Sequence, residues 1–265
     1  MLRVGTVPWL NAVPLLAGLR ERVSLVEATP AGLAPQLAAG ELDAALLPVA
    51  EAARGVGEGW LGRHGIASEG PVASVLLFLR IPLPEVRSVA LDPSSRTSAA
   101  LARHLVASET QGQARCRLAS RPGPDPQQEQ ADAVLVIGDP AREALRHWRG
   151  PVVDLGEAWT RRTGLPFVFA RWRARSGLPA ADREVLAREL DAAADRGLPQ
   201  RGVLAAQWAL ARGLDERSAV EYVQRFVRYR IGPREEEALA RFQALVRSDD
   251  ALAGLPGADG QPAGR

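Results

Sequence analysis

The sequence predicts an α/β protein of two lobes with a ligand cleft between them and helices at the C-terminal end. Three observations support this prediction. Strand patterns alternate with helix patterns up to about residue 174, they fall into two α/β units, and only helix patterns follow from Pro179 onward. The chain has 265 residues, of which 46% are hydrophobic, and this is enough to build two cores.

The first α/β unit starts with a short alternating strand and continues through short connections. Its expected strands are 2–7, 23–28 and 43–47, and its expected helices are 11–20 and 33–39. Asn11 would cap the first helix, with Pro14 in the first turn, where proline is tolerated. Strand–helix–strand connections of this length favour a parallel sheet covered by helices.

The rest of the chain gives a second unit and a helical end. We expect a further strand of the first unit at 74–80 and strands of the second unit at 87–92, 116–120, 131–138 and 167–172. Helices are expected at 93–106, 140–148, 180–196, 201–212, 216–228 and 233–247, and a Pro-rich surface loop at 121–130. Lobe I then comprises residues 1–83 and 175–265, and lobe II comprises residues 84–174. The segment 249–265 is Gly/Pro/Ala-rich and is expected to be flexible.

The composition excludes several classes of function. All 33 basic residues are Arg, so lysine Schiff-base chemistry and a P-loop lysine are excluded. Cys116 is the one cysteine, which excludes an internal disulfide and a cysteine-cluster metal site. The Arg residues are scattered and the net charge is +2, which argues against a nucleic-acid partner.

Other patterns bear on location and on metals. No apolar run reaches the roughly 18 residues that span a bilayer, and the N-terminus lacks the apolar region of a signal peptide, so we expect a cytoplasmic protein without a membrane partner. The three histidines, His64, His104 and His147, lie far apart, and no carboxylates have metal-like spacing, so we expect no metal site. The GxGxxG at 57–62 is interpreted as a Gly-rich loop, because the strand and helix it requires are missing.

The strongest candidate site is the junction of strand and helix at 91–100. Ser94, Ser95, Thr97 and Ser98 place four hydroxyls at the helix start, where free N–H groups and the helix dipole favour an anion. Arg96 could pair with a carboxylate in a bidentate manner or could be solvated. The alternative interpretation of the cluster is a plain N-cap with spare hydroxyls.

Four other segments carry polar residues that could face the cleft. In the first, Asn11 is either a simple cap or a donor and acceptor for a ligand, and Trp9 is either packing or a wall of the site. Ser74 is the one polar residue in an apolar strand run, and a bond to the backbone is its alternative role.

The remaining junctions carry carboxylates. Gly138 and Asp139 follow a buried strand, and Asp139 is either an N-cap or a carboxylate of the cleft. Asp154 and Glu157 lie further along, with capping or solvation as the alternative for both.

Taken in order, these segments resemble the chorismate dehydratases of the futalosine route to menaquinone. The motifs that carry the resemblance are VGTVPWLN at 4–11 with Pro14, GELDAALLP at 40–48, GPVASVLLF at 70–78, SVALDPSSRTS at 88–98, DAVLVIGD at 132–139, DLGEAW at 154–159, TGLPFVFA at 163–170 and RYRIGPRE at 228–235. The resemblance implies the fold of periplasmic solute-binding proteins (type II) used as an enzyme. It also implies a hydro-lyase that converts chorismate to 3-[(1-carboxyvinyl)oxy]benzoate without a cofactor.

The chain departs from the family pattern at two places. The segment Pro48–Glu51 lacks a serine that is common in the family, and Trp9 stands where tyrosine is common. The 1,4-dihydroxy-6-naphthoate synthase of the same pathway is an alternative, but its group begins with a pattern like SPCPNDT and uses a cleft histidine. A small-anion binding protein without catalysis is a second alternative, and an effector-binding domain of a regulator is a third.

The chemistry implied by the resemblance assigns roles to the candidate residues. Two substrate carboxylates need two anion sites. One is expected at the Ser94–Ser98 helix start, and the other is expected from Asn11, Ser74 and backbone N–H groups of the first unit. Asn11 is the expected catalytic residue, either orienting the hydroxyl or stabilising developing negative charge. Further substrate contacts are expected from Trp9, Arg96, Gly138, Asp139 and Glu157. A homodimer is compatible with the sequence.

The base that takes the proton is not evident from the sequence. Glu51, Asp139 and Glu157 could act as the base, but an anionic base beside a dianionic substrate is electrostatically costly. A carboxylate of the substrate acting as the base would avoid this cost.

Overall fold

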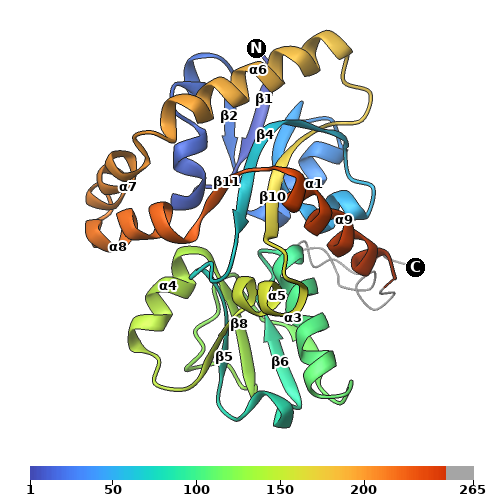
Figure 1. Ribbon diagram of the computed structural model, residues 1–265, viewed down its shortest axis with the longest axis vertical. Coiled ribbons are helices and arrows are strands. Elements are labelled where there is room, and N and C mark those ends of the chain that lie inside the picture. The colour runs from blue at the N-terminus through green and yellow to red at the C-terminus, as the bar shows by residue number, and fades with distance from the viewer. Residues whose placement is uncertain (249–265) are drawn as a thin grey trace.

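Two lobes, each built on its own sheet, make up the computed structural model, which describes residues 1–248 (Figure 1). In chain order the strands are β1 (Arg3–Thr6), β2 (Ser24–Glu27), β3 (Ala44–Pro48), β4 (Glu58–Ser68), β5 (Val75–Leu79), β6 (Ser88–Leu91), β7 (Arg115–Leu118), β8 (Ala133–Ile137), β9 (Val152–Asp154), β10 (Phe167–Ala174) and β11 (Arg228–Arg230). The α-helices are α1 (Pro30–Ala38), α2 (Val49–Ala53), α3 (Arg96–Glu109), α4 (Gly138–His147), α5 (Leu155–Thr163), α6 (Ala180–Gly197), α7 (Arg201–Leu210), α8 (Glu216–Glu221) and α9 (Pro233–Ser248).

The two sheets are mixed rather than fully parallel. Within residues 1–248 the first sheet has the order β11-β4-β10-β3-β1-β2, and the second has the order β7-β6-β8-β5-β9. The expected parallel core is present, since β1 pairs in parallel with β2 and β3, and β6 pairs in parallel with β7 and β8. Antiparallel strands are added at β10, β4 and β11 in one sheet and at β5 and β9 in the other.

The chain crosses between the lobes earlier than the sequence places the crossings. β5 pairs with β8 and β9 in the second sheet, and β10 pairs with β3 and β4 in the first. The crossings therefore follow β4 and α5, whereas the sequence places them near Pro82–Pro84 and Trp172–Ser176. An apolar strand that is buried on both faces looks the same in either sheet, so its pattern does not reveal its partners.

Glycines conceal the long strand β4 in the sequence. The expected Gly-rich loop at 57–62 lies mostly inside this strand, where Gly59 and Gly62 have φ values of +67° and +62°. The pairing of β4 with β10 contains register shifts, which interrupt the alternation that marks a strand. The sequence also gives no sign of β9, β11, α2 and α5 as separate elements.

The first expected helix is a 3-10 helix at Leu10–Leu15, and it is followed by a second short 3-10 turn at Leu19–Glu21. Its N-cap is Trp9, so the expected capping role of Asn11 is wrong, and Asn11 lies inside the first turn. Pro14 also lies inside this helix, where it lacks the N–H that a continuing α-helix would use.

The C-terminal helices return to the first lobe, as expected (Figure 1). α6 contacts β4, and α9 contacts β10 and α2. The expected helix at 216–228 is interrupted, because α8 ends at Glu221 and a π-helical turn follows at Tyr222–Phe226. The expected flexible segment 249–265 lies outside the described residues. None of the helices within residues 1–248 combines the length and apolarity that a membrane crossing requires.

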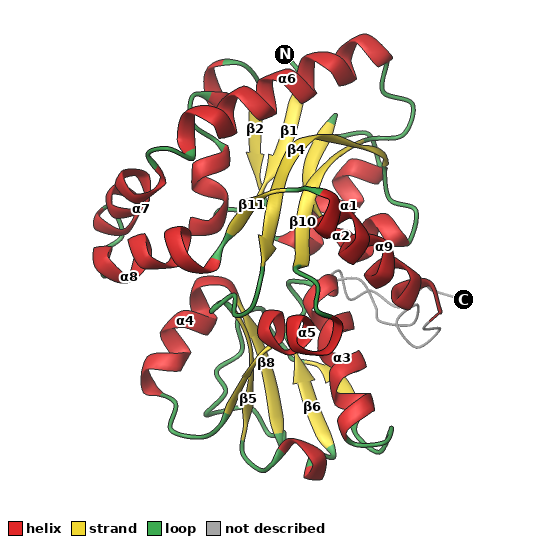
Figure 2. Cartoon of the chain, in the orientation of Figure 1, coloured by secondary structure: helices red, strands yellow, loops and turns green. Residues whose placement is uncertain are grey.

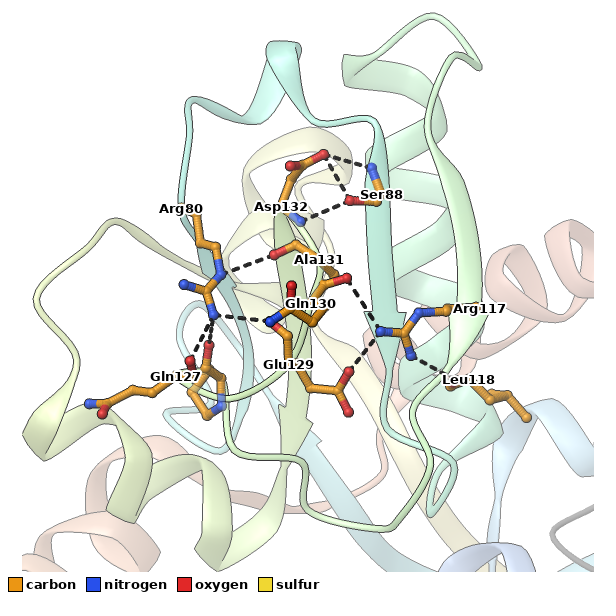
Figure 3. Close-up of polar contacts among 10 residues, drawn as sticks. Arg80, Ser88, Arg117, Leu118, Gln127, Glu129, Gln130, Ala131 and Asp132 are labelled. Atoms are coloured by element: carbon orange, nitrogen blue, oxygen red, sulfur yellow. Dashed lines mark hydrogen bonds and ion pairs between the residues drawn. The ribbon is translucent and has the colours of Figure 1, made fainter.

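Arg80 anchors the Pro-rich loop at 121–130 to the second lobe (Figure 3). Its guanidinium donates hydrogen bonds to the carbonyl oxygens of Ala131, Pro126, Gln127 and Glu129 at 2.8–3.1 Å. Nearby, the carboxylate of Asp132 accepts hydrogen bonds from the backbone N–H groups of Arg87 and Ser88 at 2.9 and 2.8 Å and from the Ser88 hydroxyl at 2.9 Å. These bonds give the carbonyl groups of the loop their hydrogen-bond partners.

Candidate interlobe site

A cavity lies between the lobes, and both lobes contribute to its wall. Its empty space, counted out to the mouth and including open solvent, is about 510 Å³. Most of the wall is apolar. The residues that line it are Val7, Trp9, Asn11, Pro30, Leu46, Pro48, Ile66, Val72, Ser74, Val75, Ser95, Ser98, Ile137, Gly138, Phe169 and Ala170.

Six of the ten residues proposed from the sequence line this cavity. They are Trp9, Asn11, Ser74, Ser95, Ser98 and Gly138. The other four lie outside the lining, namely Arg96, Thr97, Asp139 and Glu157. Among residues 1–248, the wall of the cavity therefore has no charged side chain, and its polar groups are neutral donors and acceptors.

The hydroxyl cluster at the start of α3 divides between structural roles and the cavity. Ser95 is the N-cap, and its Oγ accepts a hydrogen bond from the N–H of Ser98 at 3.2 Å and donates one to the Ser98 Oγ at 3.1 Å. The Ser94 hydroxyl donates to the buried carboxylate of Asp92. The capping interpretation is thus confirmed for Ser95, which also lines the cavity, and the anion site stays a prediction.

One contact between the lobes joins α2 to α3, and we call it the α2–α3 junction. The Thr97 Oγ1 accepts a hydrogen bond from the N–H of Ala50 at 3.1 Å. The Arg96 Nε lies 3.3 Å from the Glu51 Oε1. The N–H of Ala31 donates to the carbonyl of Ser94 at 3.0 Å. The described structure thus uses Arg96 and Thr97 to join the lobes.

Glu51 is the buried carboxylate of this junction. Its side chain is 3% exposed, and the pKa of its carboxyl is raised by burial, an effect opposed by the charges of Arg96 and Arg54. Glu51 was a candidate base, but it is paired with arginine and lies outside the cavity lining. In the segment Pro48–Glu51, which lacks a serine, Pro48 lines the cavity.

A second contact between the lobes involves α4, α8 and the segment around Trp9, and we call it the α4–α8 junction. The Arg142 Nη2 donates to the carbonyl and the hydroxyl of Ser218 at 2.9 and 2.8 Å. Asp139 lies in the first turn of α4, 3.5 Å from Arg142, and its carboxylate accepts the N–H of Leu10. Asp139 does not cap its own helix, because the cap position is Ile137.

Burial and packing define the rest of this junction. Burial raises the pKa of Asp139, and the nearby charge of Arg142 opposes the increase. Gly138 has a φ of +70°, and a Cβ added to it would lie 3.3 Å from the ring of Trp9. Trp9 is thus both a packing residue and a wall of the cavity, and Gly138 leaves the space that its ring occupies.

Tyr222 is a functional candidate that the sequence reasoning missed. Its side chain is 3% exposed, and its Oη lies 2.8 Å from the Ser74 Oγ in a buried hydrogen bond. The Asn11 side chain also hydrogen-bonds to the same phenol. Burial raises the pKa of Tyr222 to about 12, so the phenol is neutral at ordinary pH. The one available signal was chemical, since a buried tyrosine hydroxyl needs a partner.

The acidic pair on α5 has no place in the cavity wall. Asp154 caps α5 by accepting the N–H groups of Gly156 and Glu157, and it also accepts those of Val72 and Ala73. It therefore fixes the first crossing between the lobes, and burial raises its pKa. Glu157 is exposed, which agrees with the solvated alternative.

Metal-ligating side chains are not gathered in the part of the chain that the structure describes. No group of three or more His, Cys, Asp or Glu side chains in residues 1–248 is arranged to hold a metal ion. His64 is buried and its Nδ1 lies 2.8 Å from Asp191 Oδ1. Both residues lie outside the cavity lining.

Solved structures of similar fold include periplasmic binding proteins. Protein AF1704 from Archaeoglobus fulgidus matches with a TM-score of 0.75 and 14% identity, covering 94% of this chain and 97% of that one. The periplasmic aliphatic sulphonate binding protein SsuA from Escherichia coli matches with a TM-score of 0.64 and 16% identity, covering 95% of this chain and 88% of that one. These likenesses show the two-lobed fold of periplasmic binding proteins.

Sequence comparison gives the family. A chorismate dehydratase from Thermus thermophilus is 32% identical over 185 residues, which are 63% of this chain and 67% of the relative. A chorismate dehydratase from Campylobacter jejuni is 26% identical over 234 residues, which are 88% of each chain. The profile of the family described as menaquinone biosynthesis matches residues 2–248. The chain therefore belongs to the menaquinone-biosynthesis family that contains the chorismate dehydratases.

Proposed function

We propose that this protein is a chorismate dehydratase, a cytoplasmic lyase of the futalosine route that forms 3-[(1-carboxyvinyl)oxy]benzoate and water without a cofactor. The observation that carries the proposal is the convergence of Asn11, Ser74, Ser95 and Ser98 on one small cavity between the lobes. These residues belong to three separate motifs of the family. The two chorismate dehydratases that this chain resembles support the choice of substrate.

The reaction asks for positioning more than for strong catalytic groups. A base takes the proton from the ring carbon that bears the ether oxygen. The electrons of that C–H bond form the new ring double bond, and the neighbouring C–O bond breaks. Hydroxide leaves and acquires a proton to become water. Because the ring becomes aromatic, the step is downhill, and holding the substrate in a reactive geometry supplies much of the rate.

Asn11 is the proposed catalytic residue. Its Oδ1 is buried and has no hydrogen-bond partner among the described residues. A carboxamide oxygen accepts hydrogen bonds, which favours contact with the ring hydroxyl over the stabilisation of negative charge. In this role Asn11 orients the C–O bond that breaks.

The carboxylates of the substrate are held by neutral donors. One is placed at the start of α3, where the Ser98 hydroxyl and the first N–H groups of the helix are available. The other is placed near Ser74, with Trp9 and Gly138 forming the adjoining wall. Arg96, Thr97 and Asp139 act indirectly, because their contacts hold the lobes in the arrangement that forms the cavity.

The base is proposed to be a carboxylate of the substrate itself. Glu51 is paired with arginine outside the cavity, Asp139 is held by Leu10 and Arg142, and Glu157 is exposed. A negatively charged base in this apolar wall would also repel a dianionic substrate. A substrate carboxylate needs no additional charge in the cavity.

The test is to incubate the purified, dialysed protein with chorismate and to separate the products by liquid chromatography with mass detection. We expect a species lighter by one water, formed without added metal or cofactor. The Asn11→Ala variant should lower kcat by about 100-fold or more. Chorismate that is bound but unchanged by the wild-type protein would support the binding-protein alternative. Turnover of a cyclic futalosine instead would support the naphthoate synthase.

A further inference from the structure

Tyr222 lies behind the cavity wall and joins two residues that form it. It belongs to the π-helical turn after α8, whereas Asn11 follows β1 and Ser74 precedes β5. Its Oη is 2.8 Å from the Ser74 Oγ and is also hydrogen-bonded by the Asn11 side chain. One phenol therefore connects three distant segments of the chain at the point where the lobes meet.

A single phenol can serve both partners because it is neutral. A neutral hydroxyl donates one hydrogen bond and accepts others, so it can bond one partner as donor and the other as acceptor. These bonds restrict the rotation of the Asn11 carboxamide and of the Ser74 hydroxyl. The Asn11 Oδ1, which has no partner among the described residues, is thereby held in a fixed direction.

The tyrosine is itself fixed by the α4–α8 junction. The Arg142 guanidinium carbon lies 4.5 Å from the centre of the Tyr222 ring, and Arg142 also bonds to Ser218 one turn earlier. Arg142 belongs to α4 of the second lobe, whereas Tyr222 belongs to the C-terminal helices (Figure 1). Closure of the lobes therefore brings the ring and the Ser74 hydroxyl into place together.

We propose that Tyr222 is a positioning residue, which sets the orientation of Asn11 and Ser74 toward the substrate when the lobes are closed. This role rests on the proposed dehydratase function. It acts on the transition state, because the orientation of Asn11 matters most when the ring C–O bond breaks. Loss of the hydroxyl should therefore lower kcat and leave KM little changed.

The matched variants are Tyr222→Phe and Tyr229→Phe. Both tyrosines are buried, at 3% and 6% exposure, and neither lines the cavity, but the Tyr229 hydroxyl has no hydrogen-bond partner among the described residues. Each variant removes one buried hydroxyl and keeps the ring. We expect kcat for chorismate to fall about 10- to 100-fold in Tyr222→Phe and to change less than twofold in Tyr229→Phe.

A double variant tests whether Tyr222 acts through Ser74. Once Ser74→Ala has removed the shared hydroxyl, adding Tyr222→Phe should cause a much smaller further loss than it does in the wild-type protein. Losses that multiply in full when Tyr222→Phe is combined with Ser74→Ala, and also when it is combined with Asn11→Ala, would overturn the proposal. Equal kcat values for Tyr222→Phe and Tyr229→Phe, with an active wild type, would overturn the role of Tyr222 alone. A wild type that leaves chorismate intact would overturn both the function and this role.

Discussion

The two junctions between the lobes are built differently, and Figure 2 shows α2 and α3 on one side of the molecule and α4 and α8 on the other. In the α2–α3 junction, Arg96 and Thr97 bind the other lobe, while Ser95 and Ser98 of the same turn face the cavity. In the α4–α8 junction, Gly138 leaves the space beside the Trp9 ring that a Cβ would fill, and both residues line the cavity. The first junction therefore fastens the lobes beside the site, whereas the second shapes the site itself.

This difference predicts different consequences when each junction is broken. Damage to the α2–α3 junction should appear first as lost stability, because it leaves a buried carboxylate without its main partner across the lobes. Damage to the α4–α8 junction should appear as lost turnover, because the same atoms form the cavity wall.

The largest effect on stability is expected from Arg96→Ala. This change leaves the buried carboxylate of Glu51 with Arg54 as its neighbouring positive charge, and we expect the free energy of unfolding to fall by about 3 kcal/mol near pH 8. Burial already raises the pKa of Glu51 above its usual 4.5, and loss of Arg96 raises it further. A carboxyl whose pKa is higher in the folded chain than in the unfolded chain stabilises the fold at a pH below its unfolded pKa. This stabilisation is lost as the pH rises through the folded pKa.

The loss in free energy of unfolding that Arg96→Ala causes relative to wild type should therefore be larger near pH 8 than near pH 5. Urea unfolding at both pH values measures this loss. Adding Glu51→Gln to Arg96→Ala should recover much of the loss, because the buried charge is then removed. A deficit that is equal at both pH values and is unaffected by Glu51→Gln would show that Arg96 acts by packing alone.

A second change separates the shape of the cavity wall from backbone strain. Gly138 and Gly164 have nearly equal φ values of +70° and +71°, so an Ala at either position should destabilise the protein by about 1–2 kcal/mol. A Cβ on Gly138 meets the Trp9 ring at 3.3 Å, but one on Gly164 has nothing within 4 Å. We expect Gly138→Ala to lower kcat/KM for chorismate about tenfold.

Gly164→Ala should lower the midpoint of thermal unfolding by about as much as Gly138→Ala does, and it should leave kcat/KM for chorismate unchanged. Equal kcat/KM values in the two variants would mean that the contact between Gly138 and Trp9 does not set the shape of the site. Steady-state kinetics and thermal unfolding of the same preparations supply both readouts.

The sequence revealed the parallel strands and their junctions because period-two patterns and capping residues are local. It could not reveal that β5 pairs in the sheet of the second lobe and β10 in the sheet of the first. Both strands are mostly apolar, and their pairing depends on residues far away in the sequence. The sequence did not reveal strand β4, because glycines within it adopt positive φ values and glycine-rich segments are typical of loops.

The sequence could predict cavity residues where a hydroxyl at the start of a helix was enough to identify them. Ser95 and Ser98 face the cavity, but which hydroxyl of that turn would meet the opposite lobe depends on the closed arrangement of the lobes. Tyr222 was missed for the same reason, because its contacts with Asn11 and Ser74 span more than a hundred residues of sequence. Local sequence patterns therefore do not identify residues whose roles depend on contacts between the two lobes.

The smallest effect is expected away from both junctions, at Asp132 beside the Arg80 anchor (Figure 3). Hydrogen bonds, first of all from the N–H of Arg87, lower the pKa of this carboxyl below its usual 3.8. Because a lowered pKa stabilises the folded chain above the unfolded pKa, Asp132→Asn should cost about 1 kcal/mol at pH 7. The difference from wild type should shrink as pH falls through about 3.8 and below. Urea unfolding across this range measures it, while kcat/KM should stay unchanged, because Asp132 supports one lobe and neither junction. A loss of turnover in this variant would mean that the second lobe transmits distant strain to the cavity, and the division between fastening and shaping contacts would then fail.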